Sequence, residues 1–218
     1  MIKFKNLNQK RHKLYFIKLA TSWLIGVYNR TRRHIKKNDK KYILRFWFFR
    51  LLGWQRLFIT GICEEFPTDE LINSIEQELG FKLPASYVEL MKMHNGGTPK
   101  NCCFPTKERT SWAENHIAIT GIMGIGRTKT FSLGGSLGSQ FMITQWGYPN
   151  TGVFICDCPS AGHDMIMLDY SKCGKNGEPE VVHVDQEWDY KKTFLAKDFE
   201  TFIRGLVSSD VYDTSEQD

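Results

Sequence analysis

Residues 83–97 have the sequence LPASYVELMKMHNGG, and they predict the element around which the rest of the fold is organised. Pro84 suits the first turn of a helix, because its ring fixes φ near the helical value and the N–H that it lacks would have no partner there. One face of this helix is marked by residues at helical spacing: Tyr87, Leu90, Met91 and His94. Asn95-Gly96-Gly97 is a typical helix stop, so we expect His94 to lie in the last turn and not to act as a ligand.

A second helix is expected immediately before this one. Thr68 is a favourable N-cap, and the acidic side chains of Asp69 and Glu70 follow it in the first turn, where they complement the helix dipole. Gly80 supplies a C-terminal stop. The apolar face between these two ends consists of Leu71, Ile72, Ile75 and Leu79.

The middle of the chain is rich in glycine and in strand-forming residues. Residues 116–126, HIAITGIMGIG, predict a strand that runs into a turn. Their glycines are spaced G-x-x-G-x-G, the reverse of the dinucleotide fingerprint, and no strand-to-helix unit surrounds them, so a phosphate site is disfavoured. Residues 136–149, SLGSQFMITQWGYP, allow a short helix closed by Gly147 and Pro149.

The remaining sequence predicts three strands and a final helix. The strand candidates are GVFICDC (152–158), HDMIMLDY (163–170) and PEVVHVDQE (179–187), and the turn residues between them favour an antiparallel meander. The last helix shows an i, i+3, i+4, i+7 stripe of Phe199, Phe202, Ile203 and Leu206. This order indicates an α+β domain in which two N-terminal helices and one C-terminal helix pack on an antiparallel or mixed sheet.

Charge divides the chain into two opposed parts. The 218 residues have a formal net charge of +5, but residues 1–62 contain 16 Lys or Arg against the single Asp39, a net of +15. Residues 63–218 contain 13 basic and 23 acidic residues, a net of −10. We therefore expect a basic extension (1–62), an α+β domain (63–207) and a polar tail (208–218). The acidic domain is not expected to bind nucleic acid, which requires a basic face.

The basic extension has two apolar runs with interspersed cations. Residues 14–28 do not fit a signal peptide, because Lys18 interrupts the run and arginines follow it, and they are too short to span a membrane. Residues 42–58 mix arginines with Phe and Trp, a composition that suits the surface of an anionic membrane. The alternatives are a poorly ordered tail or a stretch that was never selected to fold.

Six cysteines raise the question of disulfides or a metal. Adjacent Cys102 and Cys103, and Cys156 one residue away from Cys158, do not resemble the dispersed framework of a secreted scaffold, so reduced thiols in a cytosolic protein are expected. The sequence offers four residues of zinc-binding type as a candidate site: Cys156, Cys158, His163 and Cys173. Its C-x-C spacing is not that of structural zinc sites, so we expect neither a metal nor a cofactor.

The stretch DCPSAGHDMIMLDY (157–170) supplies the residue types of a hydrolytic triad. Ser160 and His163, with Asp164 or Asp169, are the candidates. Pro159, Ser160 and Gly162 are also favoured turn formers, and no G-x-S-x-G context surrounds the serine. We therefore expect a turn between two strands and no enzyme.

Several of these stretches together resemble one known family. They are LPASYVELMKMHNGG, GIMGIG, WGYPNTGVFICDC, MIMLDY, PEVVHVDQE and FLAKDFETFIRGL, and they resemble the SUKH superfamily, which includes the Smi/Knr-type fungal cell-wall regulators. The resemblance covers residues 64–207. It implies an α+β fold and, in the bacterial branch, an immunity protein that binds and neutralises a cognate toxin, often a nuclease, of a polymorphic toxin system. The family shares no catalytic residues, so a binding function is implied and no active site.

An acidic domain suits that role, because a nuclease presents a cationic groove and an acidic protein can occupy it. The candidate contacts are acids expected to be exposed around the strand ends, one neighbouring histidine and two tryptophan anchors: Asp157, His163, Asp164, Glu178, Asp185, Glu187, Asp189, Trp112 and Trp188. We expect a cytoplasmic protein with a basic toxin as its partner. The alternative is a regulatory or scaffolding protein held at a membrane by residues 1–62.

Overall fold

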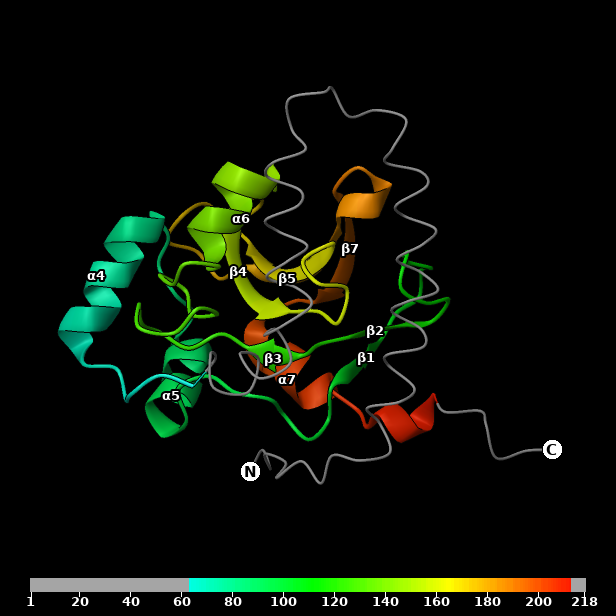
Figure 1. Cartoon of the computed structure of the whole chain (residues 1–218), viewed down its shortest axis with the longest axis horizontal. Helices are drawn as coiled ribbons and strands as arrows, with labels where there is room; N and C mark the ends of the chain where they lie inside the picture. The colour runs from blue at the N-terminus through cyan, green and yellow to red at the C-terminus, as the bar shows by residue number, and fades with distance from the viewer. Residues whose placement is uncertain (1–62, 213–218) are drawn as a thin grey trace, which may run out of the picture. The chain divides into compact units, whose positions relative to one another are not determined.

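The computed structural model describes residues 63–212 (Figure 1). The helices are α4 (Asp69–Leu79), α5 (Ala85–Met93), α6 (Ser139–Trp146) and α7 (Phe199–Gly205), with 3₁₀ turns η1 (Gln186–Trp188) and η2 (Ser209–Val211). The strands are β1 (Cys103–Pro105), β2 (His116–Ala118), β3 (Gly121–Ile122), β4 (Gly152–Asp157), β5 (Asp164–Asp169), β6 (Glu180–Asp185) and β7 (Lys191–Ala196). The predicted α+β class is confirmed. The predictions for residues 14–28 and 42–58 lie outside the described residues.

The main sheet is a five-stranded antiparallel meander in the order β3-β4-β5-β6-β7, and β1 pairs with β2 in a separate small sheet. The three predicted strands are β4, β5 and β6 at its centre. The sequence allowed an antiparallel or a mixed sheet. The sheet is purely antiparallel, because each strand pairs with its neighbour in sequence. Every residue of β4 and β5 is buried, so both faces of the sheet are covered.

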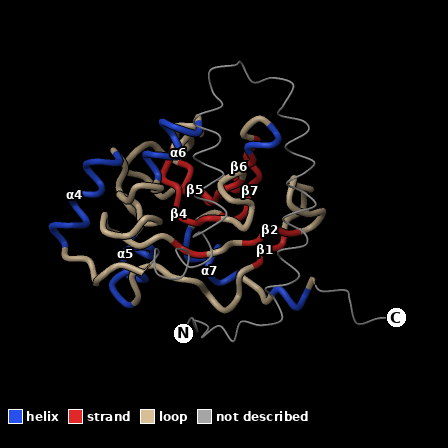
Figure 2. The backbone as a smooth tube through the Cα atoms, in the orientation of Figure 1, coloured by secondary structure: helices blue, strands red, loops and turns tan. Residues whose placement is uncertain are grey.

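The helices cover the sheet at different strands (Figure 2). Helix α6 contacts β4, while α7 contacts β6, β7 and β1 and also packs on α5. The stripe predicted for the last helix faces inward, with Phe199 and Phe202 almost fully buried. Tyr87 of α5 packs edge-on against Phe199, with ring centroids 4.9 Å apart, which joins the N-terminal helices to the C-terminal one.

The helix ends follow the sequence signals. The Thr68 side chain accepts a hydrogen bond from Leu71 N–H, and Gly80 ends α4 in the left-handed conformation at φ 76°. Helix α5 begins directly after Pro84 and ends at Met93, so His94 forms its C-cap. Among the described helices, none has both the length and the apolar composition needed to cross a membrane.

The Asn-Gly-Gly stop has a second role, because it binds the glycine-rich turn that follows β3. Asn95 is 2% exposed, its amide donates to the backbone oxygens of Glu65 and Ile125, and its side-chain oxygen accepts from Ile125 N–H at 2.7 Å. A Cβ on Gly124 would lie 2.8 Å from the Asn95 carbonyl oxygen. The close approach of these two segments therefore requires glycine at position 124.

Candidate functional site

Most of the candidate contacts named from the sequence lie at one end of the sheet, where β4 ends, β5 begins, β6 ends and β7 begins. In the strand register Asp164 lies opposite Asp185, and Asp185 lies opposite Lys191. Of the nine candidate contacts, only Glu178 lies elsewhere, in the turn between β5 and β6 at the opposite end. Burial and the nearby charge of Asp198 raise the pKa of Glu178.

Three of the acids expected at the surface are buried. Asp157, Asp164 and Asp185 have exposed fractions of 2%, 1% and 1%, so the expectation that they are exposed was wrong. Part of the cover comes from the segment that connects β1 to β2, in which Ser111 N–H donates to Asp185 Oδ2 at 2.9 Å. These carboxylates lie beneath the surface and are not accessible to a partner in this conformation.

A buried histidine that sequence reasoning missed faces one of these acids. His183 Nε2 lies 2.7 Å from Asp164 Oδ2, and both side chains are essentially inaccessible to solvent. The signal was present in PEVVHVDQE: alternate residues of a strand share a face, so His183 and Asp185 lie on the same side of β6. The antiparallel partner strand then brings Asp164 opposite Asp185.

The surroundings of Asp157, Cys156 and Cys158 favour the protonated forms of these three groups. Burial, with a further contribution from the nearby charge of Asp164, raises the pKa of Asp157 to about 8, although the Thr120 hydroxyl acts in the opposite direction. Burial also raises the pKa of the Cys156 and Cys158 thiols well above the usual value. Without a cation beside them, both thiols stay protonated and unreactive.

The triad arrangement is not formed. Ser160 Oγ accepts a hydrogen bond from Asp164 N–H at 3.0 Å, which is turn chemistry of the kind predicted. His163 Nδ1 instead lies 3.0 Å from Glu187 Oε1.

The zinc set considered from the sequence is not assembled either. Cys173 is exposed in the turn after β5, at the opposite end of the sheet from Cys158. Within residues 63–212, one group of histidine, cysteine or acidic side chains has ligand atoms close enough for a metal ion. It consists of Cys158, Asp164 and His183, all buried. Only Cys158 belongs to both sets.

The same end of the sheet also has exposed and partly exposed side chains, which we call the sheet-end surface. It consists of Trp112, Trp146, His163, Glu187, Trp188 and Asp189. Trp112 and Trp188, the two candidate anchors, are 37% and 38% exposed. Lys191 Nζ lies 5.4 Å from the centre of the Trp188 ring and forms an ion pair with Glu108 at 3.0 Å.

The turn that presents Trp188 is held in an unusual backbone conformation. Asp189 and Tyr190 are consecutive residues with φ of 55° and 58°, a region that side chains other than glycine seldom occupy. The Tyr190 hydroxyl donates to the Trp146 carbonyl oxygen at 2.5 Å, and its ring packs edge-on against Tyr148. These contacts tie the β6–β7 turn to the end of α6.

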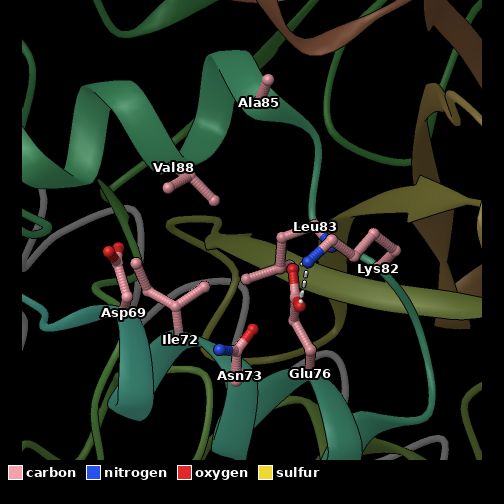
Figure 3. A pocket seen from close by; sticks show the side chains of 8 residues that line it. All are labelled: Asp69, Ile72, Asn73, Glu76, Lys82, Leu83, Ala85 and Val88. Atoms are coloured by element: carbon pink, nitrogen blue, oxygen red, sulfur yellow. Dashed lines mark hydrogen bonds and ion pairs between the residues drawn. The ribbon is translucent and has the colours of Figure 1, made fainter.

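An open groove between α4 and α5 is a second feature of the surface (Figure 3). Its lining consists of Asp69, Ile72, Asn73, Glu76, Lys82, Leu83, Ala85 and Val88. Glu76 accepts hydrogen bonds from Lys82 Nζ at 2.6 Å and from Leu83 N–H at 2.9 Å. Its carboxylate is thus engaged in holding the connection between the two helices, and the groove presents no catalytic or metal-binding arrangement.

Comparison with known proteins gives one result. The sequence profile of the SMI1-KNR4 cell-wall family (SUKH_6) matches residues 69–203. No curated protein matches the chain. Since the profile covers more than half of the 218 residues and coincides with the α+β domain described above, the chain belongs to the SUKH superfamily through its SMI1-KNR4 cell-wall family.

Proposed function

We propose that this chain is a non-enzymatic, cytoplasmic immunity protein that binds and neutralises a cognate protein toxin. The observation that supports the proposal most strongly is membership of the SUKH superfamily over residues 69–203. The engagement of Ser160 with the Asp164 backbone, and of His163 with Glu187, agrees with a binding role.

The sheet-end surface has the composition of a protein-binding site. Interfaces derive most of their binding energy from a few aromatic residues surrounded by polar groups, and Trp112 and Trp188 are half-exposed aromatics of this kind. The contacts of Tyr190 fix the turn before binding, so little conformational entropy is lost when Trp188 meets a partner. We therefore propose that the two tryptophans are the main anchors.

Charge contributes to the rate of association more than to its strength. Leaving out the three buried aspartates brings the formal charge of residues 63–218 from −10 to −7, which still favours a basic partner such as a nuclease domain. At the sheet end itself the acids are largely paired: Glu187 with His163, Glu108 with Lys191, and Glu114 with Arg109. Long-range attraction would bring the partner in, and the aromatic contacts would hold it.

A second candidate function rests on residues 1–62. Their 16 basic residues and aromatic runs favour a regulatory or scaffolding protein that contacts an anionic membrane. Removal of residues 1–62 distinguishes the two proposals. Residues 63–218 alone should still neutralise a toxin if the acidic domain is sufficient, whereas a membrane-held scaffold would lose its location.

The test of the first proposal needs a candidate toxin, which is sought among the genes that neighbour this one. Cells that express the C-terminal domain of this toxin are co-transformed with the wild-type chain or with the double variant Trp112→Ala/Trp188→Ala. The wild type should restore growth, and the double variant should bind the toxin domain at least about tenfold more weakly by calorimetry and lose protection.

The matched control is Met93→Ala, since Met93 is 70% exposed but lies at the end of α5, outside the sheet-end surface. This variant should protect as the wild type does. Absence of any complex with the wild-type chain at low salt would refute the immunity proposal. Equal binding by the double variant would leave the immunity function in place and refute the assignment of the surface.

A further inference from the structure

The buried end of the sheet contains more carboxyl groups than the described structure pairs with a cationic side chain. Asp157, Asp164 and Asp185 lie together at this end, and their carboxylates are nearly inaccessible. Among the ion pairs of residues 63–212, His183 is the sole partner of any of them. Burying a carboxylate without a counter-charge is costly, so a positive charge at this position would stabilise the fold.

The same groups contain polar atoms that have no hydrogen-bond partner. Among the described residues these include Asp164 Oδ1, His183 Nδ1, Asp157 Oδ2 and Asp185 Oδ1. Buried polar atoms in folded proteins almost always have a partner, and a bound ion can supply one where the protein does not. Three of these atoms belong to side chains on one face of the sheet, because Asp164 lies opposite Asp185 and His183 is two residues before Asp185, and they point to a missing ligand on that face.

We propose that Cys158, Asp164 and His183 bind a zinc ion. One ligand atom from each of the three lies within 4.8 Å of the others. Zinc bonds of about 2.0–2.3 Å place tetrahedral ligand atoms about 3.5 Å apart, so the three side chains need only a small inward adjustment. A thiolate, an imidazole and a carboxylate form a ligand set that zinc favours over magnesium or calcium, which prefer oxygen alone.

Binding balances both charge and protons. The Cys158 thiol releases its proton to solvent and becomes a thiolate. The ion takes the place of the proton between His183 Nε2 and Asp164 Oδ2; that proton moves to His183 Nδ1 or, where Nδ1 already carries one, to solvent, so the imidazole is neutral. The two charges of Zn²⁺ then match those of the thiolate and the Asp164 carboxylate, with neutral His183 as the third ligand.

The proposed site is structural. All three ligands are buried, and catalytic zinc needs an open position for water or substrate. Asp185, which shares the face of Asp164 and has an unpaired buried oxygen, is the candidate for a fourth ligand. An ion here would join the end of β4, the start of β5 and the end of β6 beneath the sheet-end surface. The inference does not depend on the identity of any protein partner.

The experiment uses the full-length chain in a background that carries Cys63→Ser and Cys173→Ser, because these two exposed thiols could bind zinc adventitiously. The protein is unfolded with chelator and refolded with Zn²⁺ or with Co²⁺, and bound metal is measured by mass spectrometry. We expect one zinc per chain, a thiolate-to-cobalt charge-transfer absorption, and a melting temperature that falls when the metal is removed.

Two matched variants locate the site. Cys158→Ser should lose most of the zinc and the cobalt absorption, whereas Cys156→Ser should keep both, since Cys156 is equally buried two residues earlier in the chain but outside the ligand group. If Cys158→Ser does not fold, the test rests on Cys156→Ser. The thiolate-to-cobalt charge-transfer absorption must persist in this variant. A background protein that binds no zinc after refolding with Zn²⁺, a cobalt spectrum without a thiolate band, or zinc retained by folded Cys158→Ser would each overturn the proposal.

Discussion

At the scale of single residues, Asn95 shows how one side chain can join two segments of this fold. Its amide group makes three hydrogen bonds to the backbone of the domain's first residues and of the turn after β3. A carboxylate at this position keeps the acceptor but removes both donors and faces two carbonyl oxygens. We expect Asn95→Asp to reduce the free energy of unfolding by about 2–4 kcal/mol, measured by urea denaturation at pH 7.

The control for this prediction is Asn150→Asp, because Asn150 is exposed in a loop before β4. Its effect should stay within about 0.5 kcal/mol. A loss of similar size in both variants would mean that the hydrogen bonds of Asn95 contribute little beyond a general effect of added negative charge.

Asp169, which the sequence offered as a triad member, is instead a structural carboxylate with a predictable pH dependence. Burial alone raises its pKa, but hydrogen bonds from Lys192 at 2.8 Å and from Ser171 outweigh burial and hold the pKa below its ordinary value of 3.8. A carboxyl whose pKa is lowered by folding stabilises the protein at pH values above its unfolded pKa, and that contribution is lost as the pH falls through the folded value.

We therefore expect Asp169→Asn to lower the free energy of unfolding at pH 7. The difference in this free energy between the variant and the wild type should become smaller as the pH falls below about 4. Urea unfolding of both proteins between pH 7 and pH 2.5 measures this difference. A gap that stays constant over the whole range would show that the ionised form of Asp169 is not the source of its effect.

At the scale of elements, the β6–β7 turn depends on one hydroxyl. Tyr190 has a left-handed backbone, and its hydroxyl donates to the carbonyl oxygen of Trp146 at the end of α6. Tyr190→Phe keeps the ring packing and removes this bond, so we expect a loss of about 1 kcal/mol in thermal unfolding and faster hydrogen exchange in residues 186–190. The control is Tyr212→Phe, whose ring stacks on His116 outside this turn and whose change should be near zero.

The elements also show what the sequence could predict. Helix α4, the stop after α5 and the three central strands carried local signals, and those predictions are confirmed. Strands β1 and β3 are three and two residues long, too short for an alternating pattern. Strand β7 begins with two lysines at the edge of the sheet, a sequence that resembles a loop as much as a strand.

The candidate site was predictable in position but not in depth. The turn residues indicated that Asp157, Asp164 and Asp185 stand at the ends of strands, and they do. Asp185 looks the same in the sequence whether it faces solvent or is covered, because its cover comes from Ser111, 74 residues away. Burial of a polar strand end is decided by such long-range packing, which no local pattern reports.

At the scale of the whole molecule, opposed charges in the two parts of the chain predict opposed behaviour toward polyanions. The full chain carries the +15 of residues 1–62, whereas residues 63–218 carry −10. We expect the full chain to float with vesicles that contain phosphatidylserine, and a fragment of residues 63–218, with its fold checked by circular dichroism, to remain unbound. Each lysine or arginine near an anionic surface contributes about 1 kcal/mol, so raising the salt should weaken binding.

The composition of residues 42–58 sharpens this experiment. If the aromatic side chains of this run enter the membrane interface, part of the binding should survive at high salt, because apolar transfer is not screened. A full-length variant with Trp47→Ala and Trp54→Ala then loses the salt-resistant part and keeps the salt-sensitive part. Binding that disappears completely at high salt in the wild type would assign residues 1–62 a purely electrostatic role, and no binding at low salt would remove the membrane alternative.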